Sequence, residues 1–216
     1  MKNAALFLIP LLLPVSAFAF EKAELSDVEI TKLEQGQPII SVWKDEDRKH
    51  TPSISRGGID IMAPASLIWE IMLDCDRISE VSTDIRECKV LDAAEDGSWD
   101  VRKQKFAVSP YLPKVNSTFR TDYSGNDIEG RAMSIMKISG DLKVQEGRWD
   151  IIPLSPTDTR VIYQAAIEPK FPIPDRVIRK QVSIGIPEIL ENLRSLAEND
   201  HAMTVKNAAM PDDPAL

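Results

Sequence analysis

Few residues of this chain have the side-chain chemistry that catalysis usually needs. The two histidines, His50 and His201, fall in a charged N-terminal segment and in a polar C-terminal tail, so neither is expected beside a binding cavity. Histidine is the usual general base near neutral pH and the commonest metal ligand. The sequence also contains no G-x-S-x-G serine motif, no P-loop and no G-x-G-x-x-G motif. We therefore expect no catalytic residue of these common kinds.

Carboxylates occur in pairs, and Asp74 and Asp76 together with Asp84 could bind calcium. Their spacing is not that of an EF-hand loop. Carboxylates in loops and at helix ends are mostly solvated. We therefore expect these side chains at the surface, and we expect no metal and no cofactor.

The informative side chains are apolar and aromatic, and they recur with the period of two that is typical of strands. One such face runs along residues 115–123 and another along residues 159–167. Each side chain could either fill an ordinary core or line a ligand cavity, and methionine would suit a cavity that adapts to its ligand. The candidates for a cavity wall on the strands are Phe106, Phe119, Tyr123, Met133, Trp149, Ile151, Tyr163 and Ala165, with Met136 as a further one.

Two of these candidates also carry a polar group. A buried tyrosine hydroxyl needs a hydrogen-bond partner, so Tyr123 or Tyr163 could offer a polar handle to a ligand. Arg120 and Asp122 alternate with Phe119 and Tyr123. They should therefore point to the opposite, exposed side of the same strand.

The candidate side chains belong to a series of short alternating segments. Turn residues such as Asp96-Gly97, Gly125-Asn126-Asp127 and Ser139-Gly140 separate the segments. Consecutive strands joined by short turns form an antiparallel meander. A first strand is followed by two short helices and then by six more strands. The predicted strands cover residues 54–62, 85–94, 99–108, 115–124, 128–138, 141–153 and 158–168.

A long helix is predicted from about Pro174 to Glu198, because apolar residues recur there at spacings of three and four. Pro187 lies inside it and is expected to kink it near residues 183–186. This helix would add Val177, Gln181 and Ile184 to the cavity wall. The proline-rich segments 109–113 and 171–174 would lie at the cavity mouth, as clamps or membrane-touching tips, or else form packed turns.

The first nineteen residues have the features of a cleavable secretory signal peptide. Lys2 precedes an apolar stretch, and Ala17-Phe18-Ala19 is a small-x-small cleavage site, so we expect cleavage between Ala19 and Phe20. The apolar stretch is shorter than the about 20 residues that span a bilayer. The mature protein is therefore expected in the periplasm.

Residues 20–50 form an N-terminal extension. Ser26 or Asp27 could cap a short helix that Gly36 ends, and residues 38–43 read as a short strand. Whether the extension packs on the rest of the chain or lies free stays open.

The chain has two cysteines, Cys75 and Cys88. Outside the cytoplasm such a pair is expected to form a disulfide. A metal site is the alternative, but two cysteines without a nearby histidine make a poor one.

The formal net charge of the chain is −8. A nucleic-acid partner calls for a basic face, so this balance argues against one. It also argues against binding an anionic membrane by charge alone.

The predicted elements indicate an α+β fold in which a curved antiparallel sheet of six to seven strands wraps around the long C-terminal helix. One face of such a sheet must be covered, and this helix is the predicted element long enough to cover it. A strongly curved sheet around one helix encloses a volume that the helix need not fill. The fold therefore predicts an internal cavity.

Residues 54–199 resemble the START-like (SRPBCC) superfamily, which has the helix-grip fold. The resemblance rests on the segments IDIMAPASLIWEIMLDCDRISE, CKVL, GDLKVQEGRWDIIPL and FPIPDRVIRKQVSIGIPEILENLRSL. The most similar branch is the polyketide cyclase / coenzyme Q-binding type, with exported bacterial members. On this basis the chain divides into a signal peptide (1–19), the extension (20–50), a START-like domain (51–199) and a disordered acidic tail (200–216).

The resemblance implies a hydrophobic cavity for a lipid, a quinone or a similar molecule, and it implies no particular reaction. We expect a non-enzymatic periplasmic protein that binds or carries such a ligand. The alternative is a cyclase- or aromatase-like enzyme, which predicts a buried arginine or aspartate beside Tyr123 or Tyr163. A plain interaction module with a filled core is a third. The expected partners are the hydrophobic ligand and, transiently, a membrane, with no nucleic acid, and the protein is expected to be a monomer.

Overall fold

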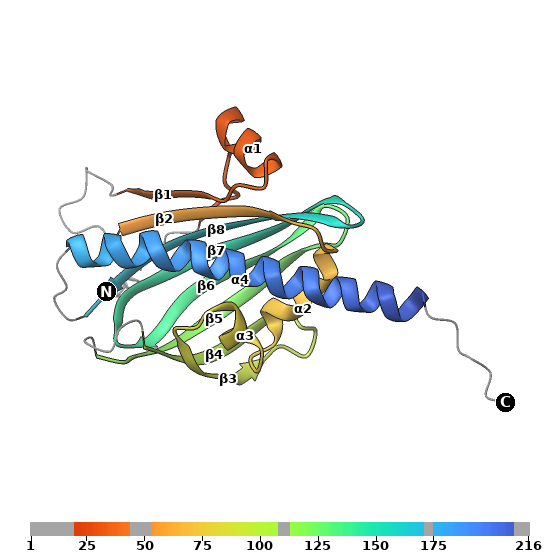
Figure 1. Ribbon diagram of the computed structural model, residues 1–216. Coiled ribbons are helices and arrows are strands. Elements are labelled where there is room, and N and C mark those ends of the chain that lie inside the picture. Colours follow the sequence, from red (N-terminus) through yellow and green to blue (C-terminus); the bar gives the residue numbers. More distant parts are fainter. Residues whose placement is uncertain (1–19, 44–52, 108–112, 171–174, 210–216) are drawn as a thin grey trace, which may run out of the picture.

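The computed structural model describes residues 20–43, 53–107, 113–170 and 175–209 (Figure 1). The predicted signal peptide with Ala19, the extension residue His50, the end of the tail and most of the two proline-rich segments lie outside these residues.

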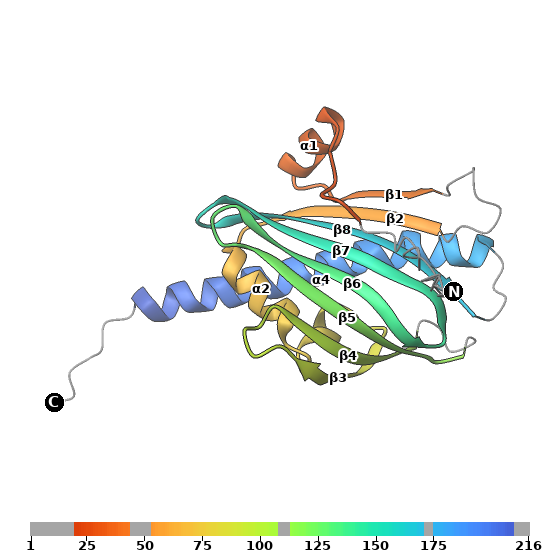
Figure 2. The ribbon, with the colours of Figure 1, turned by 180° about the vertical axis from the view of Figure 1, so that it is seen from behind.

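The core of the molecule is one curved antiparallel sheet of eight strands (Figures 1 and 2). Its strand order is β1-β2-β8-β7-β6-β5-β4-β3, so the meander from β3 to β8 follows the chain and β2 pairs with the last strand. The strands are β1 (Ile39–Trp43), β2 (Ser53–Ile61), β3 (Ile85–Ala93), β4 (Trp99–Phe106), β5 (Val115–Asn126), β6 (Gly130–Gly140), β7 (Leu142–Ser155) and β8 (Asp158–Pro169).

The sheet has one strand more than the six to seven predicted, because the N-terminal extension supplies β1. Ile39 of β1 pairs with Gly58 of β2, and Trp43 pairs with Ile54. The extension also forms α1 (Asp27–Glu34), which begins with a capping box between Ser26 and Glu29. The extension therefore packs on the domain.

Apolar residues of the extension form a small cluster on the outer face of the sheet. Leu33 and Ile39 bury Ile162 of β8, and Ala23 and Leu25 pack against them. Gln164 Nε2 donates a hydrogen bond to the carbonyl oxygen of Glu21 at 2.8 Å. Both faces of β8 are consequently covered.

Three helices lie on the concave face: α2 (Ala65–Leu73), α3 (Ile78–Val81) and α4 (Asp175–Ala209) (Figure 1). The main core includes Ile186, Leu190 and Leu193 of α4. A Cβ atom on Gly57 of β2 would lie 2.5 Å from Ile186 Cγ2 and 2.9 Å from Leu190 Cδ1, so this close approach of strand and helix requires glycine.

The helix α4 is longer than predicted. The prediction of a disordered tail from residue 200 is wrong for residues 200–209, because these residues continue the helix to Ala209. These residues contain no glycine or proline, and Pro211 is the first helix breaker after Pro187. None of the described helices is both long enough and apolar enough to span a membrane.

The contacts of α4 are uneven across the sheet. The helix lies close to β1 and β2 at one edge of the sheet and to α2 and α3 on its other side. Among the described residues, the backbones of β4 to β7 do not approach α4 in this way. The helix meets the middle strands through side chains, since Met133 of β6 and Trp149 of β7 share the main core with Leu193 of α4.

Candidate ligand-binding site

Most of the predicted wall residues do share the concave face. Met133, Trp149 and Ile151 belong to the main buried cluster, and Phe106, Tyr123 and Tyr163 pack against it while keeping some accessible surface. Phe119 and Ala165 are buried on the same side of β5 and β8. The structure thus brings these eight side chains to one surface, some as packed core and some as accessible wall.

Two other candidates lie elsewhere. Val177 and Ile184 of α4 are 38% and 51% exposed. Ile184 is two residues, about 200° around a helix, from the buried Ile186. Val177 and Ile184 therefore lie on the outer face of α4. Gln181 is half-buried and has a partner.

Met136 is 45% exposed on the outer face of β6. It is three residues from the inward Met133, and side chains at odd separations in a regular strand point to opposite faces.

Tyr163 carries a polar group on the concave face. Its ring lies against that of Trp149, with the centroids 4.3 Å apart. Burial raises the pKa of Tyr163 to about 12, so its hydroxyl stays protonated near neutral pH. Among the described residues this hydroxyl has no hydrogen-bond partner. A ligand oxygen or a water molecule could accept its proton.

The sequence analysis missed three polar residues on this face: Asp100, Arg102 and Gln104 of β4. All three are at least nine-tenths buried. The alternation that points Phe106 inward also points these residues inward. Charged strand residues usually face solvent, so the sequence alone gives no sign that Asp100 and Arg102 point inward.

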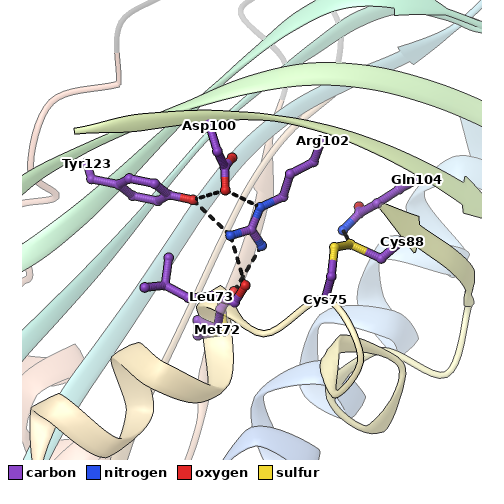
Figure 3. A network of polar contacts seen from close by, with 8 residues as sticks. All are labelled: Met72, Leu73, Cys75, Cys88, Asp100, Arg102, Gln104 and Tyr123. Carbon is purple, nitrogen blue, oxygen red and sulfur yellow. Dashed lines mark hydrogen bonds and ion pairs between the residues drawn. A yellow bond between two sulfur atoms is a disulfide. The ribbon is translucent and has the colours of Figure 1, made fainter. Parts of the chain in front are cut away.

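Arg102, Asp100 and Tyr123 form a buried hydrogen-bonded network (Figure 3). Arg102 Nε donates to Asp100 Oδ2 at 2.8 Å, and Arg102 Nη2 donates to the Tyr123 hydroxyl at 2.8 Å. That hydroxyl donates to Asp100 Oδ2 at 2.6 Å. The cluster matches the buried charge beside Tyr123 that a cyclase-like enzyme would predict.

The same arginine also holds α2 against the sheet. Arg102 Nη1 donates to the carbonyl of Met72 at 3.2 Å, and Nη2 donates to that of Leu73 at 3.1 Å. These carbonyls lie at the C-terminal end of α2, where intrahelical donors run out. Arg102 therefore both neutralises Asp100 and caps α2.

Two details bear on the chemistry of this network. Burial, followed by the hydrogen bond to Asp100, raises the pKa of Tyr123, so this tyrosine is an uncharged donor near neutral pH. Asp100 Oδ1 is buried and accepts no hydrogen bond within the described part of the chain. The network can thus accept one hydrogen bond from a further polar group.

A disulfide lies beside the network, as predicted. Cys75 and Cys88 are bonded, with their Cα atoms 5.3 Å apart, and they join the turn after α2 to β3 (Figure 3). Gln104 Nε2 lies 3.6 Å from Cys88 Sγ. The end of α2 is therefore held by one covalent and two hydrogen-bonded links.

A separate groove of about 710 Å³ lies outside the concave face, where α1, the end of β2 and α4 meet. Three of its charged groups already have protein partners: Asp60 pairs with Arg160, Glu198 accepts from the Met62 backbone N–H, and Arg194 donates to the Gly36 carbonyl. This groove is a weaker candidate than the concave face.

One protein family matches most of the chain. The family described as polyketide cyclase / dehydrase and lipid transport matches residues 61–194. A comparison with curated proteins finds no match.

Several solved structures have the same fold at low sequence identity. A STAR-related lipid transfer protein from Xanthomonas axonopodis aligns with a TM-score of 0.64 and 15% identity over 81% of this chain and 96% of its own. The human StAR-related lipid transfer protein 5 aligns with a TM-score of 0.65 and 9% identity over 76% and 83%. The Zhui aromatase/cyclase from a Streptomyces species aligns with a TM-score of 0.56 and 12% identity over 72% and 97%.

Proposed function

Because the chain belongs to the polyketide cyclase / dehydrase and lipid transport family, we propose that it binds and carries a hydrophobic small molecule such as a lipid or a quinone, without catalysis. The ligand would lie between α4 and the middle strands of the sheet. The observation that carries this proposal is that Phe106, Tyr123 and Tyr163 pack against the core on the concave face and still keep accessible surface.

The side chains around this space define the chemistry of the ligand. Phe106 and Ile135 are accessible apolar residues, and Tyr163 adds one uncharged hydroxyl without a partner in the described chain. Pockets for small molecules are mostly apolar with a few polar groups that orient the ligand. A largely apolar molecule with a hydrogen-bonding oxygen fits this surface.

We further propose that the carrier acts as an exported monomer in the periplasm. The predicted signal peptide with cleavage between Ala19 and Phe20 supports export. The disulfide between Cys75 and Cys88 fits the same compartment, because such bonds persist in oxidising environments.

Ligand content tests the carrier proposal. We expect a mass spectrum of an organic extract of freshly purified protein to show a co-purifying hydrophobic molecule. Ile135 is half-buried on the inner face of β6. The variant Ile135→Trp should lower the bound amount by about tenfold, equivalent to about 1.4 kcal/mol of binding free energy, because the larger side chain would occupy space that the ligand needs.

Met136→Trp is the matched control, because Met136 is the next residue of the same strand and points outward. Its ligand content should equal that of the natural protein. Absence of any extractable molecule from repeated preparations, or equal loss in both variants, would contradict the proposal.

The buried network favours one second function, a cyclase-like enzyme. Tyr123 could donate a proton to a ligand oxygen, with Asp100 and Arg102 holding its hydroxyl in place. For a carrier we expect the extracted molecule to have the same mass in the natural protein and in Tyr123→Phe. A different mass in the variant would show that the natural protein converts its ligand, and the enzyme would replace the carrier.

A further inference from the structure

The charged residues of this protein are separated along the length of the sheet. In an antiparallel meander the successive connections lie at alternate ends. The β3–β4, β5–β6 and β7–β8 turns therefore share one end, and the start of β5, the β6–β7 turn, the end of β8 and the start of α4 share the other (Figures 1 and 2). The first end carries the acidic side chains Glu95, Asp96, Asp127, Glu129 and Asp158.

The other end is basic, and its cations form what we call the basic rim. The backbone N–H of Asp141 donates to the Asn116 carbonyl at 2.8 Å, and that of Lys170 donates to the Asp141 carbonyl at 3.0 Å. These bonds join three of the segments, and the first turns of α4 lie at the same end (Figure 1). The basic rim consists of Lys114, Lys137, Lys170, Arg176, Arg179 and Lys180.

The cations of the basic rim have no ion pairs, a property that they share with other described cations, namely Lys22, Lys32, Arg86, Lys89, Lys103 and Lys206. Among the described residues, none of its six side chains lies within ion-pair distance of a carboxylate. Of the carboxylates nearby, Glu168 pairs with Lys143, and Asp141 stays charged: hydrogen bonds from Asn116 and then the charge of Lys170 lower its pKa. By contrast, ion pairs neutralise most arginines of the sheet and one of the rest of α4, namely Arg56, Arg102, Arg120, Arg131, Arg148, Arg160 and Arg194.

The position of the α4 cations is unfavourable for the helix itself. The N-terminal end of a helix carries partial positive charge, and cations there are destabilising. Arg176, Arg179 and Lys180 nevertheless occupy the first two turns of α4. An external anionic surface would offset this repulsion.

Exposed apolar side chains lie among these cations. Val177 of α4 is 38% exposed, and Ile138 beside Lys137 is 55% exposed. Cationic side chains interleaved with apolar ones are the pattern of segments that lie at a lipid–water interface.

We propose that the basic rim docks the protein onto the surface of an anionic phospholipid bilayer. The six cations would contact lipid phosphates, and Val177 and Ile138 would enter the headgroup region. The acidic end would point away from the membrane, so a chain of net charge −8 can still bind in one orientation. This proposal stands on the charge distribution and goes beyond ligand binding.

Vesicle binding tests the proposal. Vesicles of phosphatidylcholine with about 30% phosphatidylglycerol should sediment the protein at low salt, and release it at about 0.5 M salt, where the Debye length is only a few ångströms. Vesicles of phosphatidylcholine alone should not bind it. Because each cation near an anionic surface adds about one kilocalorie per mole, Arg176→Glu with Lys180→Glu should lower the partition coefficient at least about 30-fold.

The matched control changes the net charge equally at sites away from the basic rim. Lys22→Glu with Lys206→Glu should stay within about threefold of the natural protein, because both lysines are exposed outside the basic rim. Equal losses in the two double variants, equal binding to uncharged vesicles, or no binding at all would overturn the proposal. Ligand content measured on the same samples should not change, which separates docking from the carrier proposal.

Discussion

Replacing Arg102 with alanine is expected to lower the free energy of unfolding by about 3–5 kcal/mol, since removing one partner of a buried ion pair leaves an uncompensated charge. Asp100 would lose that partner, and the carbonyls of Met72 and Leu73 would lose their donors. For a chain of this size the melting temperature should fall by about 6–20 °C. Thermal unfolding followed by circular dichroism measures the change.

Arg120→Ala is the control for this prediction. Arg120 and Asp122 lie two residues apart on β5, the strand next to β4, and they form an ion pair like that of Arg102 with Asp100. The Arg120–Asp122 pair, however, is nearly half-exposed. Exposed ion pairs contribute little to stability, so the melting temperature should hardly change. Equal effects of the two substitutions would show that the Arg102 network does not hold α2.

Removing the disulfide should have the next largest effect. The variant with Cys75→Ser and Cys88→Ser loses a cross-link between residues 13 positions apart. Constraint of the unfolded chain by a loop of this length stabilises a protein by about 3 kcal/mol. We therefore expect a melting temperature about 6–12 °C lower than that of the oxidised protein.

Chemical reduction of the natural protein is the control for the disulfide prediction. A reducing agent should lower the melting temperature of the natural protein to nearly that of the double serine variant, and it should leave the variant unchanged. Free thiols titrated in protein isolated under oxidising conditions, or an unchanged melting temperature after full reduction, would contradict the prediction.

The architecture could be predicted because its elements have clear periods. Alternation along β4 to β8 and the apolar stripe of α4 that includes Val182, Ile186 and Leu193 gave an α+β helix-grip fold, which the structure and the family comparison confirm. The pairing of Cys75 with Cys88 was also correct. These features depend on local patterns and on the chemistry of the cysteines.

The errors concern relations that a local pattern does not contain. Val177 and Ile184 were assigned to the cavity, although the stripe through Ile186 puts them on the opposite side of the helix. Asp100 and Arg102 were missed because their burial depends on α2, whose terminal carbonyls need Arg102. A buried charge of this kind is recognised only once its partners from another element are known.

The net charge of the chain also gave no indication of the surface proposed to contact a membrane. The value of −8 argued against binding an anionic membrane by charge alone. The alternating ends of the meander, however, collect unpaired cations such as Lys114, Lys170 and Arg176 at one end. The strand topology creates a basic face, which the net charge of the whole chain does not show.

The pairing of β2 with β8 has a consequence for the speed of folding. The side chains of Asp60 and Arg160, which pair across these strands, are 100 residues apart in sequence. Contacts between such distant segments slow folding, because a long loop must close before they form. For the proposed exported chain, which would enter a translocation channel from its N-terminus, β1 and β2 can pair with each other early, but β2 has no partner on its other edge until β8 has emerged.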